Sequence, residues 1–207
     1  AAGAPSHSIH LKPLAEDALS LPVRTGKARV IGIEPASLVT KSLVREVKTD
    51  DAGCFQSALN PGLTKIAVIE RHKRTGKLGI GILEGYGLTG GAIATTISHD
   101  SHNIVVAGDN DPDMLLAVRE LADMGGGIVS VHGGAIRRLP LPIAGLMTSA
   151  DPQEVNAVLH DMLVAARAEL GIPEDVEPFM TLSFMALPVI PELKLTARGL
   201  FNVNTFS

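Results

Sequence analysis

Aromatic residues are scarce in this chain of 207 residues, which contains no Trp, one Tyr and five Phe. Proteins that bind single-stranded nucleic acid stack the bases on aromatic side chains, and this sequence offers few of them. The net charge is −4, and basic residues occur in short pairs such as Lys73-Arg74 and Arg137-Arg138. A surface that binds nucleic-acid phosphates needs a concentrated positive patch. We therefore expect no nucleic-acid partner.

Cysteine and long apolar runs are also missing. Cys54 is the only cysteine, which excludes an intrachain disulfide and a cysteine-rich zinc site, and is consistent with a reducing, cytoplasmic location. No uninterrupted apolar run approaches the ~18 residues of a membrane span, so we expect no membrane partner. The chain opens without an initiator Met and without the pattern of a secretory signal. Such a beginning is consistent with a fragment of a longer product.

Apolar residues are plentiful at 45% of the chain, so a sizeable core can form, and it must be aliphatic. The sequence divides at a strong breaker, Asn60-Pro61-Gly62. We predict that residues 1–60 form a β-rich connecting segment and that residues 61–207 form the main domain. The β-branched residues of the first part predict strands over 9–14, 28–34 and 38–47.

The main domain mixes strands and helices without strict alternation. The apolar run 65–70 predicts a buried strand, and Gly-Gly inside 128–139 predicts a hairpin. Asp111 and Asp151 each precede a proline and a helical apolar stripe, so each is predicted to cap a helix. The apolar segment 179–187 fits either a strand or a buried helix. This pattern favours an α+β fold, with a mixed sheet and at least two helices, over a parallel barrel.

One hexapeptide concentrates polar chemistry: Ser98-His99-Asp100-Ser101-His102-Asn103, which lies between the apolar runs 91–97 and 104–108. Loops between buried strands often present functional side chains. The same residue types also stabilise turns by bonding to their own backbone. We expect a tight turn at the end of a buried strand, with at least two of its side chains in local hydrogen bonds.

Three residues of this hexapeptide, His99, Asp100 and His102, are of types that bind metals. A metal hydrolase needs about three protein ligands and an open position for water, and the other histidines are scattered singly. A self-contained metal site stays an alternative, but we assign no metal ligand within this chain. The glycine-rich stretch 76–91 completes no Gly-x-Gly-x-x-Gly and no P-loop, so we predict no nucleotide-phosphate loop.

Five blocks of the sequence resemble, in order, the C-terminal domain of bacterial adenine deaminase, a member of the amidohydrolase superfamily. The resemblance spans about residues 65–201 and is less distinctive in the first 60 residues. Ala197 replaces an acidic residue of the tail pattern, a departure that affects no candidate catalytic residue. The blocks are 67–72, 87–88, 98–106, 139–147 and 187–196.

The resemblance implies hydrolysis of adenine to hypoxanthine and ammonia, a reaction of purine salvage and adenine catabolism. It also implies manganese or iron held in a TIM-like barrel. This chain lacks the His-x-His pair of that barrel and is shorter than the roughly 250 residues that a barrel takes. We therefore expect adenine and the barrel as partners, no metal fully ligated by this chain, and no activity of the chain alone.

The resemblance and the chemistry together nominate His99, Asp100 and His102 as catalytic residues, and Ser101 and Asn103 as substrate-binding residues. In this interpretation the domain covers or completes an active site on the barrel. The alternative is a purely structural or oligomerisation domain, in which the hexapeptide only fixes a turn. The sequence leaves open whether the chain associates with copies of itself.

Overall fold

A computed structural model describes residues 8–207, and it confirms an α+β fold built on a mixed sheet. The strand order of the eight-stranded sheet is β2-β1-β4-β3-β6-β5-β7-β8, and the only parallel pair in that sheet is β1 with β4. Strands β9 and β10 form a separate hairpin. In chain order the elements are β1 (Lys27–Ile33), β2 (Thr40–Glu46), the 3-10 helix η1 (Ser57–Leu59), β3 (Leu63–Ile69), β4 (Leu78–Glu84), β5 (Gly91–Thr95), β6 (Ile104–Gly108), α1 (Asp111–Asp123), β7 (Gly127–His132), β8 (Ala135–Pro140), α2 (Pro152–Ala168), α3 (Pro178–Phe184), β9 (Leu193–Thr196) and β10 (Gly199–Asn202).

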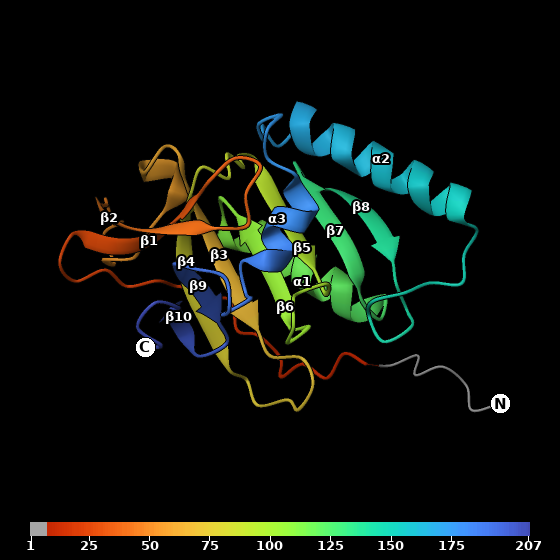
Figure 1. Ribbon diagram of the computed structural model, residues 1–207, viewed down its shortest axis with the longest axis horizontal. Coiled ribbons are helices and arrows are strands. Elements are labelled where there is room, and N and C mark those ends of the chain that lie inside the picture. The colour runs from red at the N-terminus through yellow and green to blue at the C-terminus, as the bar shows by residue number, and fades with distance from the viewer. Residues whose placement is uncertain (1–7) are drawn as a thin grey trace.

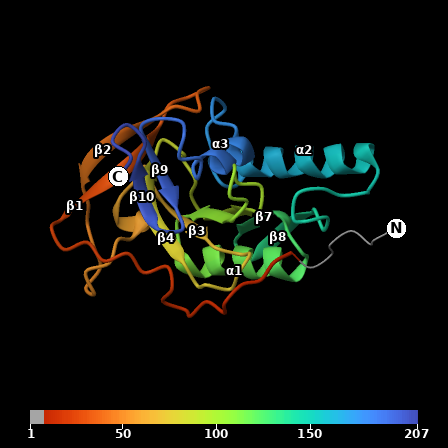
Figure 2. The same ribbon diagram turned by 60° about the horizontal axis from the view of Figure 1, so that its bottom comes forward.

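The large sheet is covered on both faces (Figures 1 and 2). Helices α2 and α3 and the β9–β10 hairpin lie on one face, and α1 lies on the other. Ile66 and Val68 of β3 therefore pack into the core beneath α2 and α3, whereas Ala67 and Ile69 pack into the core beneath α1. Because successive side chains of a strand point to opposite faces, a strand covered twice reads as a continuous apolar run.

The strands predicted over 28–34, 38–47 and 65–70 are confirmed as β1, β2 and β3, and the hairpin over 128–139 is confirmed as β7 and β8. Strands β1 and β2 continue the large sheet beside β4. The strand predicted over 9–14 is wrong. That segment runs without strand pairing, and its apolar side chains pack against the α1 core.

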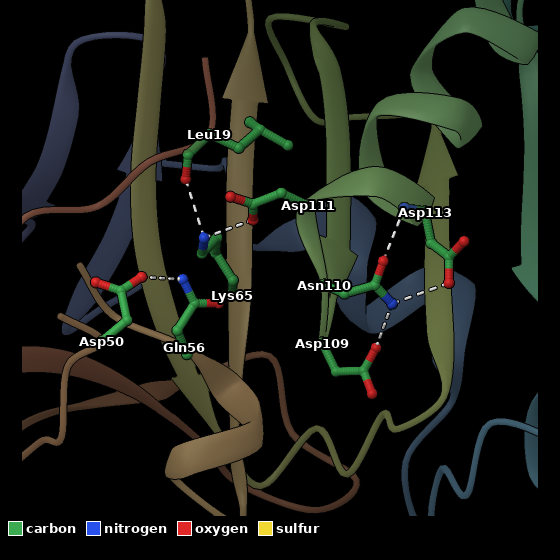
Figure 3. Close-up of polar contacts among 8 residues, drawn as sticks. All are labelled: Leu19, Asp50, Gln56, Lys65, Asp109, Asn110, Asp111 and Asp113. Atoms are coloured by element: carbon green, nitrogen blue, oxygen red, sulfur yellow. Dashed lines mark hydrogen bonds and ion pairs between the residues drawn. The ribbon is translucent and has the colours of Figure 1, made fainter. Parts of the chain in front are cut away.

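Both predicted helices are present, with one correction at a cap. Asp151 caps α2 by accepting a hydrogen bond from Gln153 N at 2.8 Å. Helix α1 is capped by Asn110, not Asp111, and the Asn110 side chain accepts from Asp113 N. The Asp111 carboxylate instead forms an ion pair with Lys65 at 2.5 Å (Figure 3). Segment 179–187, which the sequence left undecided, begins with α3.

The glycine-rich stretch holds β4, on which the β9–β10 hairpin packs closely. A side chain at Gly79 would collide with the backbone oxygen of Thr196. Within residues 8–207, no helix has both the length and the apolar character that crossing a membrane requires.

Candidate functional site in the turn before β6

Residues 98–103 connect β5 to β6 in a tight turn, as the sequence predicted. His102 N donates to Ser98 O at 2.6 Å, which closes the turn. His102 has a φ of +46°, in the left-handed region that few residues other than glycine adopt. The ends of β3 and β8 and the starts of β6 and β7 meet at the same edge of the sheet. The turn is therefore surrounded by loops of that edge.

The side chains of this turn do not hold it together, so the expectation of local side-chain hydrogen bonds is wrong. Within residues 8–207 five buried side-chain atoms have no hydrogen-bond partner, and three belong to this turn. They are Ser98 Oγ, His102 Nδ1 and Asn103 Oδ1. A buried polar atom without a partner costs about 1–3 kcal/mol. Unpaired buried polar atoms are rare in folded proteins, so three of them in six residues make this turn a candidate functional site.

Arg71 fixes the turn from outside, and the sequence did not single it out. The residue is 1% exposed, and its Nε donates to the carbonyl oxygen of His102. Its Nη2 donates to Ala144 O at 3.0 Å, and its Nη1 donates to the carbonyl and hydroxyl oxygens of Ser8 at 3.2 and 3.1 Å. Among residues 8–207 no carboxylate pairs with it, and burial lowers the pKa of its guanidinium. In the sequence Arg71 looked like one of several solvated charges after β3.

Glu70 orders the loop beside the turn. Its carboxylate accepts from the backbone N of His72, Lys73 and Thr75 and from Thr75 Oγ1, at 2.6–3.0 Å. Although burial raises the pKa of Glu70, these hydrogen bonds lower it to about 2. The ordered loop places His72 Nε2 2.8 Å from the carbonyl oxygen of Ser101. Arg71 and His72, which follow β3, thus both support the turn through its backbone.

The two histidines of the turn lie close together, and His99 packs against α3. Their ring centroids are 5.8 Å apart, and the His99 ring lies 4.7 Å from that of Phe184. Burial lowers the pKa of His102, and the neighbouring His99 and Arg71 lower it further. His102 is therefore neutral near pH 7, with a buried Nδ1 available for a proton or a hydrogen bond. Asp100 is exposed beside them.

The other two nominated residues line a groove on the neighbouring side. Ser101 and Asn103 form part of an open groove of about 600 Å³. The loop 70–77, Pro188 and the 196–201 hairpin supply the remaining walls. All five nominated residues therefore lie in one turn. His99 faces α3, whereas Ser101 and Asn103 line the groove.

The turn does not form a metal centre by itself. In the part of the chain that the structure describes, no group of three His, Cys, Asp or Glu side chains could hold a metal ion. The two imidazoles could supply two ligands at most, fewer than the three that a catalytic zinc-type site needs. A complete centre would require ligands from outside residues 8–207.

Comparison with known proteins gives consistent matches. The family model described as "Adenine deaminase C-terminal domain" matches residues 37–207. A protein of Nitratidesulfovibrio vulgaris named "Adenine deaminase" is 58% identical over 201 residues, which cover 97% of this chain and 35% of that protein. "Adenine deaminase 2" of Carboxydothermus hydrogenoformans is 46% identical and "Adenine deaminase" of Clostridium acetobutylicum 44%, with the same coverages. The chain spans about a third of the length of the curated relatives it matches.

Proposed function

Because this chain belongs to the adenine deaminase C-terminal domain family, we propose that it is the C-terminal part of a longer adenine deaminase and that turn 98–103 contributes to the active site. The reaction is the hydrolysis of adenine to hypoxanthine and ammonia. We place it in purine salvage and adenine catabolism in the cytoplasm. The polypeptide that carries the preceding portion ahead of Ala1 is called the full-length protein below.

One observation carries the role of the turn: three buried polar atoms without a partner lie within six residues. A turn that served only the fold would gain stability by bonding its serine, histidine and asparagine side chains to its own backbone. Here Arg71 and His72 support the backbone instead, which leaves the side chains free. The same turn exposes Asp100 and Ser101, and polar groups on a rigid support are suited to bind a small polar substrate.

The chemistry assigns a role to each nominated residue. Water adds to the purine carbon that bears the amino group, that group takes a proton, and it leaves as ammonia. A divalent metal, manganese or iron, bound by the preceding portion would supply the activated water. Neutral His102 accepts a proton and returns it to the leaving amine, with His99 and Asp100 beside it as further acid–base groups. Ser101 and Asn103 donate to and accept from the polar edge of the purine.

The first experiment measures ammonia and hypoxanthine formation from adenine, with the full-length protein and with the 207-residue chain, each supplied with manganese or iron. We expect turnover by the full-length protein and none by the chain. Turnover by the purified chain would contradict the proposed division of labour. Absence of turnover by the folded, metal-loaded full-length protein would contradict the proposed reaction.

A second experiment separates an active-site role from the alternative of a structural or oligomerisation domain. Adenine is titrated calorimetrically into the full-length protein and into its His99→Gln variant. Weaker binding or slower turnover by a variant of unchanged melting temperature supports an active-site role. Unchanged binding and turnover in the His99→Gln protein would favour the structural alternative.

A further inference from the structure

We propose that the sheet edge carrying turn 98–103 is the face on which the preceding portion of the same polypeptide docks. The docking face is defined as turn 98–103, loop 143–147 and the outer side of α3 continued to Val189. The inference rests on the proposed function in one respect only, namely that the full-length protein contains a portion ahead of this chain. It names the surface that this portion covers.

The first argument is the place where the chain enters the domain. His10 N donates to the carbonyl oxygen of Arg71 at 2.7 Å, and Ser8 accepts two hydrogen bonds from the Arg71 guanidinium. That guanidinium also binds the carbonyl oxygens of His102 and Ala144. One buried side chain therefore joins residue 8, the turn and loop 143–147. Residue 8, the first residue that the structure describes, therefore lies at the docking face.

The second argument is the amount of protein that must be accommodated. The relatives extend for nearly two thirds of their length beyond the part that this chain matches, and the matched family is described as a C-terminal domain. That portion precedes residue 8 in the chain, and the surface around residue 8 is the part of the described domain nearest to it in sequence. The docking face is the surface that surrounds this residue.

The third argument is the exposed apolar surface on α3, which contacts the turn, and on loop 143–147, which Arg71 links to the turn. Met147 in the loop and Met180 in α3 are 58% and 57% exposed, and Val189 is 66% exposed. Phe184 follows Met180 by one helical turn, so Met180 and Phe184 lie on one side of α3. The Phe184 ring packs against the His99 ring. Exposed methionines beside buried unpaired polar atoms are typical of a surface that a partner covers.

The fourth argument is charge. Three cations, Lys73, Lys77 and Arg198, line the groove next to the turn together with one carboxylate, that of Glu70. In the described part of the chain none of the three cations lies within ion-pair distance of a carboxylate. The floor between them includes the apolar side chains of Leu200 and Phe201. The portion that docks here is therefore expected to offer apolar side chains to the methionines and carboxylates to the groove.

Hydrogen exchange of backbone amides tests the inference directly. We compare the 207-residue chain with the full-length protein. Segments 98–103, 143–147 and 178–189 are expected to exchange about tenfold or more slowly in the full-length protein. Segment 109–113, at the opposite edge of the sheet, serves as the internal control and is expected to exchange at the same rate in both. Protection of the opposite edge or the α1 face instead, or no protection anywhere, would overturn the proposal.

Substitutions then test the named side chains. Met147→Glu and Met180→Glu, introduced together into the full-length protein, are expected to abolish the added protection. Val44→Glu is the matched control, because Val44 is 61% exposed and lies on β2 at the far end of the sheet. Circular dichroism of the 207-residue chain with each substitution checks that the domain still folds. Retained protection in the folded double variant would contradict the proposal.

The two proposals fail separately. Protection of the docking face in a full-length protein that releases no ammonia from adenine would leave the docking surface in place and remove the proposed reaction. Turnover of adenine with protection elsewhere would keep the reaction and remove both this docking surface and the active-site role of turn 98–103.

Discussion

Polar residues flank β6 at both ends, but their side chains are hydrogen-bonded at one end and unpaired at the other. At the far end, after Gly108, the Asp109 carboxylate accepts from Gly90 N and Gly91 N at 2.6 and 3.0 Å. Asn110 donates to the carboxylates of Asp109 and Asp113 and accepts from Asp113 N, each at 2.9 Å (Figure 3). At the near end, turn 98–103 makes no side-chain hydrogen bond within the described chain. Polarity alone therefore does not identify a functional turn, whereas unpaired buried atoms separate the two.

The charged groups at the far end are likewise paired within the fold. Lys65 is 3% exposed, and its ammonium group binds Asp111 at 2.5 Å and the carbonyl oxygen of Leu19 at 3.0 Å (Figure 3). An acidic run with this many internal partners is explained by the fold. The turn before β6 has no such explanation, and we assign it to function on that contrast.

The largest effect is expected from His102→Gln in the full-length protein. If the imidazole transfers a proton, turnover of adenine should fall by ~10²–10⁴. The melting temperature should hardly change, because no hydrogen bond to the His102 ring is lost. Ammonia release and thermal unfolding are measured on the same preparation.

Asn110→Ala is the control for that experiment at the other end of β6. It should lower stability and leave turnover per folded molecule unchanged. If His102→Gln behaved like Asn110→Ala, the contrast between the two ends would disappear and the turn would be structural.

The next largest effect is expected from Lys65→Met. Breaking a buried ion pair by removing one partner costs about 3–5 kcal/mol, but Asp111 is 21% exposed and can be partly hydrated. We therefore expect a loss of about 2 kcal/mol in the urea denaturation of the 207-residue chain. Adding Asp111→Asn to Lys65→Met should restore part of it. A variant as stable as the original chain would show that the pair contributes nothing.

Asp111 also shows which contacts could not be predicted from the sequence. The local pattern correctly placed the start of α1 within one residue, but the cap is Asn110. Asp111 binds Lys65, which lies 46 positions earlier and which no local pattern could connect with it. Likewise, segment 9–14 has an apolar pattern like a strand, yet it packs beneath α1 without a strand partner. Local spacing determined most strands and helices, and long-range contacts decided the exceptions.

The same division applies to the candidate site. Residue types alone located turn 98–103 between two buried strands. They could not reveal that its side chains are unpaired, because that depends on Arg71 and His72 supporting the backbone from β3's end. Arg71 itself stands in a run of charges that is indistinguishable in sequence from a solvated loop. Only the fold shows that it is buried.

Asparagine occurs at both ends of β6, which allows a matched test of smaller size. Asn110→Ala removes a helix cap and should cost about 1 kcal/mol. Asn103→Ala removes a buried amide oxygen that has no partner and with it the cost of burying that atom, so we expect stability to stay unchanged or to rise. Urea denaturation of both variants of the 207-residue chain measures the difference. Equal costs would mean that Asn103 is bonded within the domain after all.

The smallest effect that we expect is a dependence of stability on pH at the near end of β6. The pKa of His102 is lower in the folded chain than in the unfolded chain, because burial and the neighbouring His99 and Arg71 disfavour the charged ring. As the pH falls below about 6.5, the unfolded state binds a proton that the folded state does not, so stability decreases until the pH passes the folded pKa. His102→Gln removes this decrease. The stability of the variant relative to the original chain should therefore rise as the pH falls from 7.5 to 5.5, measured by urea denaturation. A difference that is constant over this range, or that changes in the other direction, would show that the imidazole is not held in its neutral form by the turn.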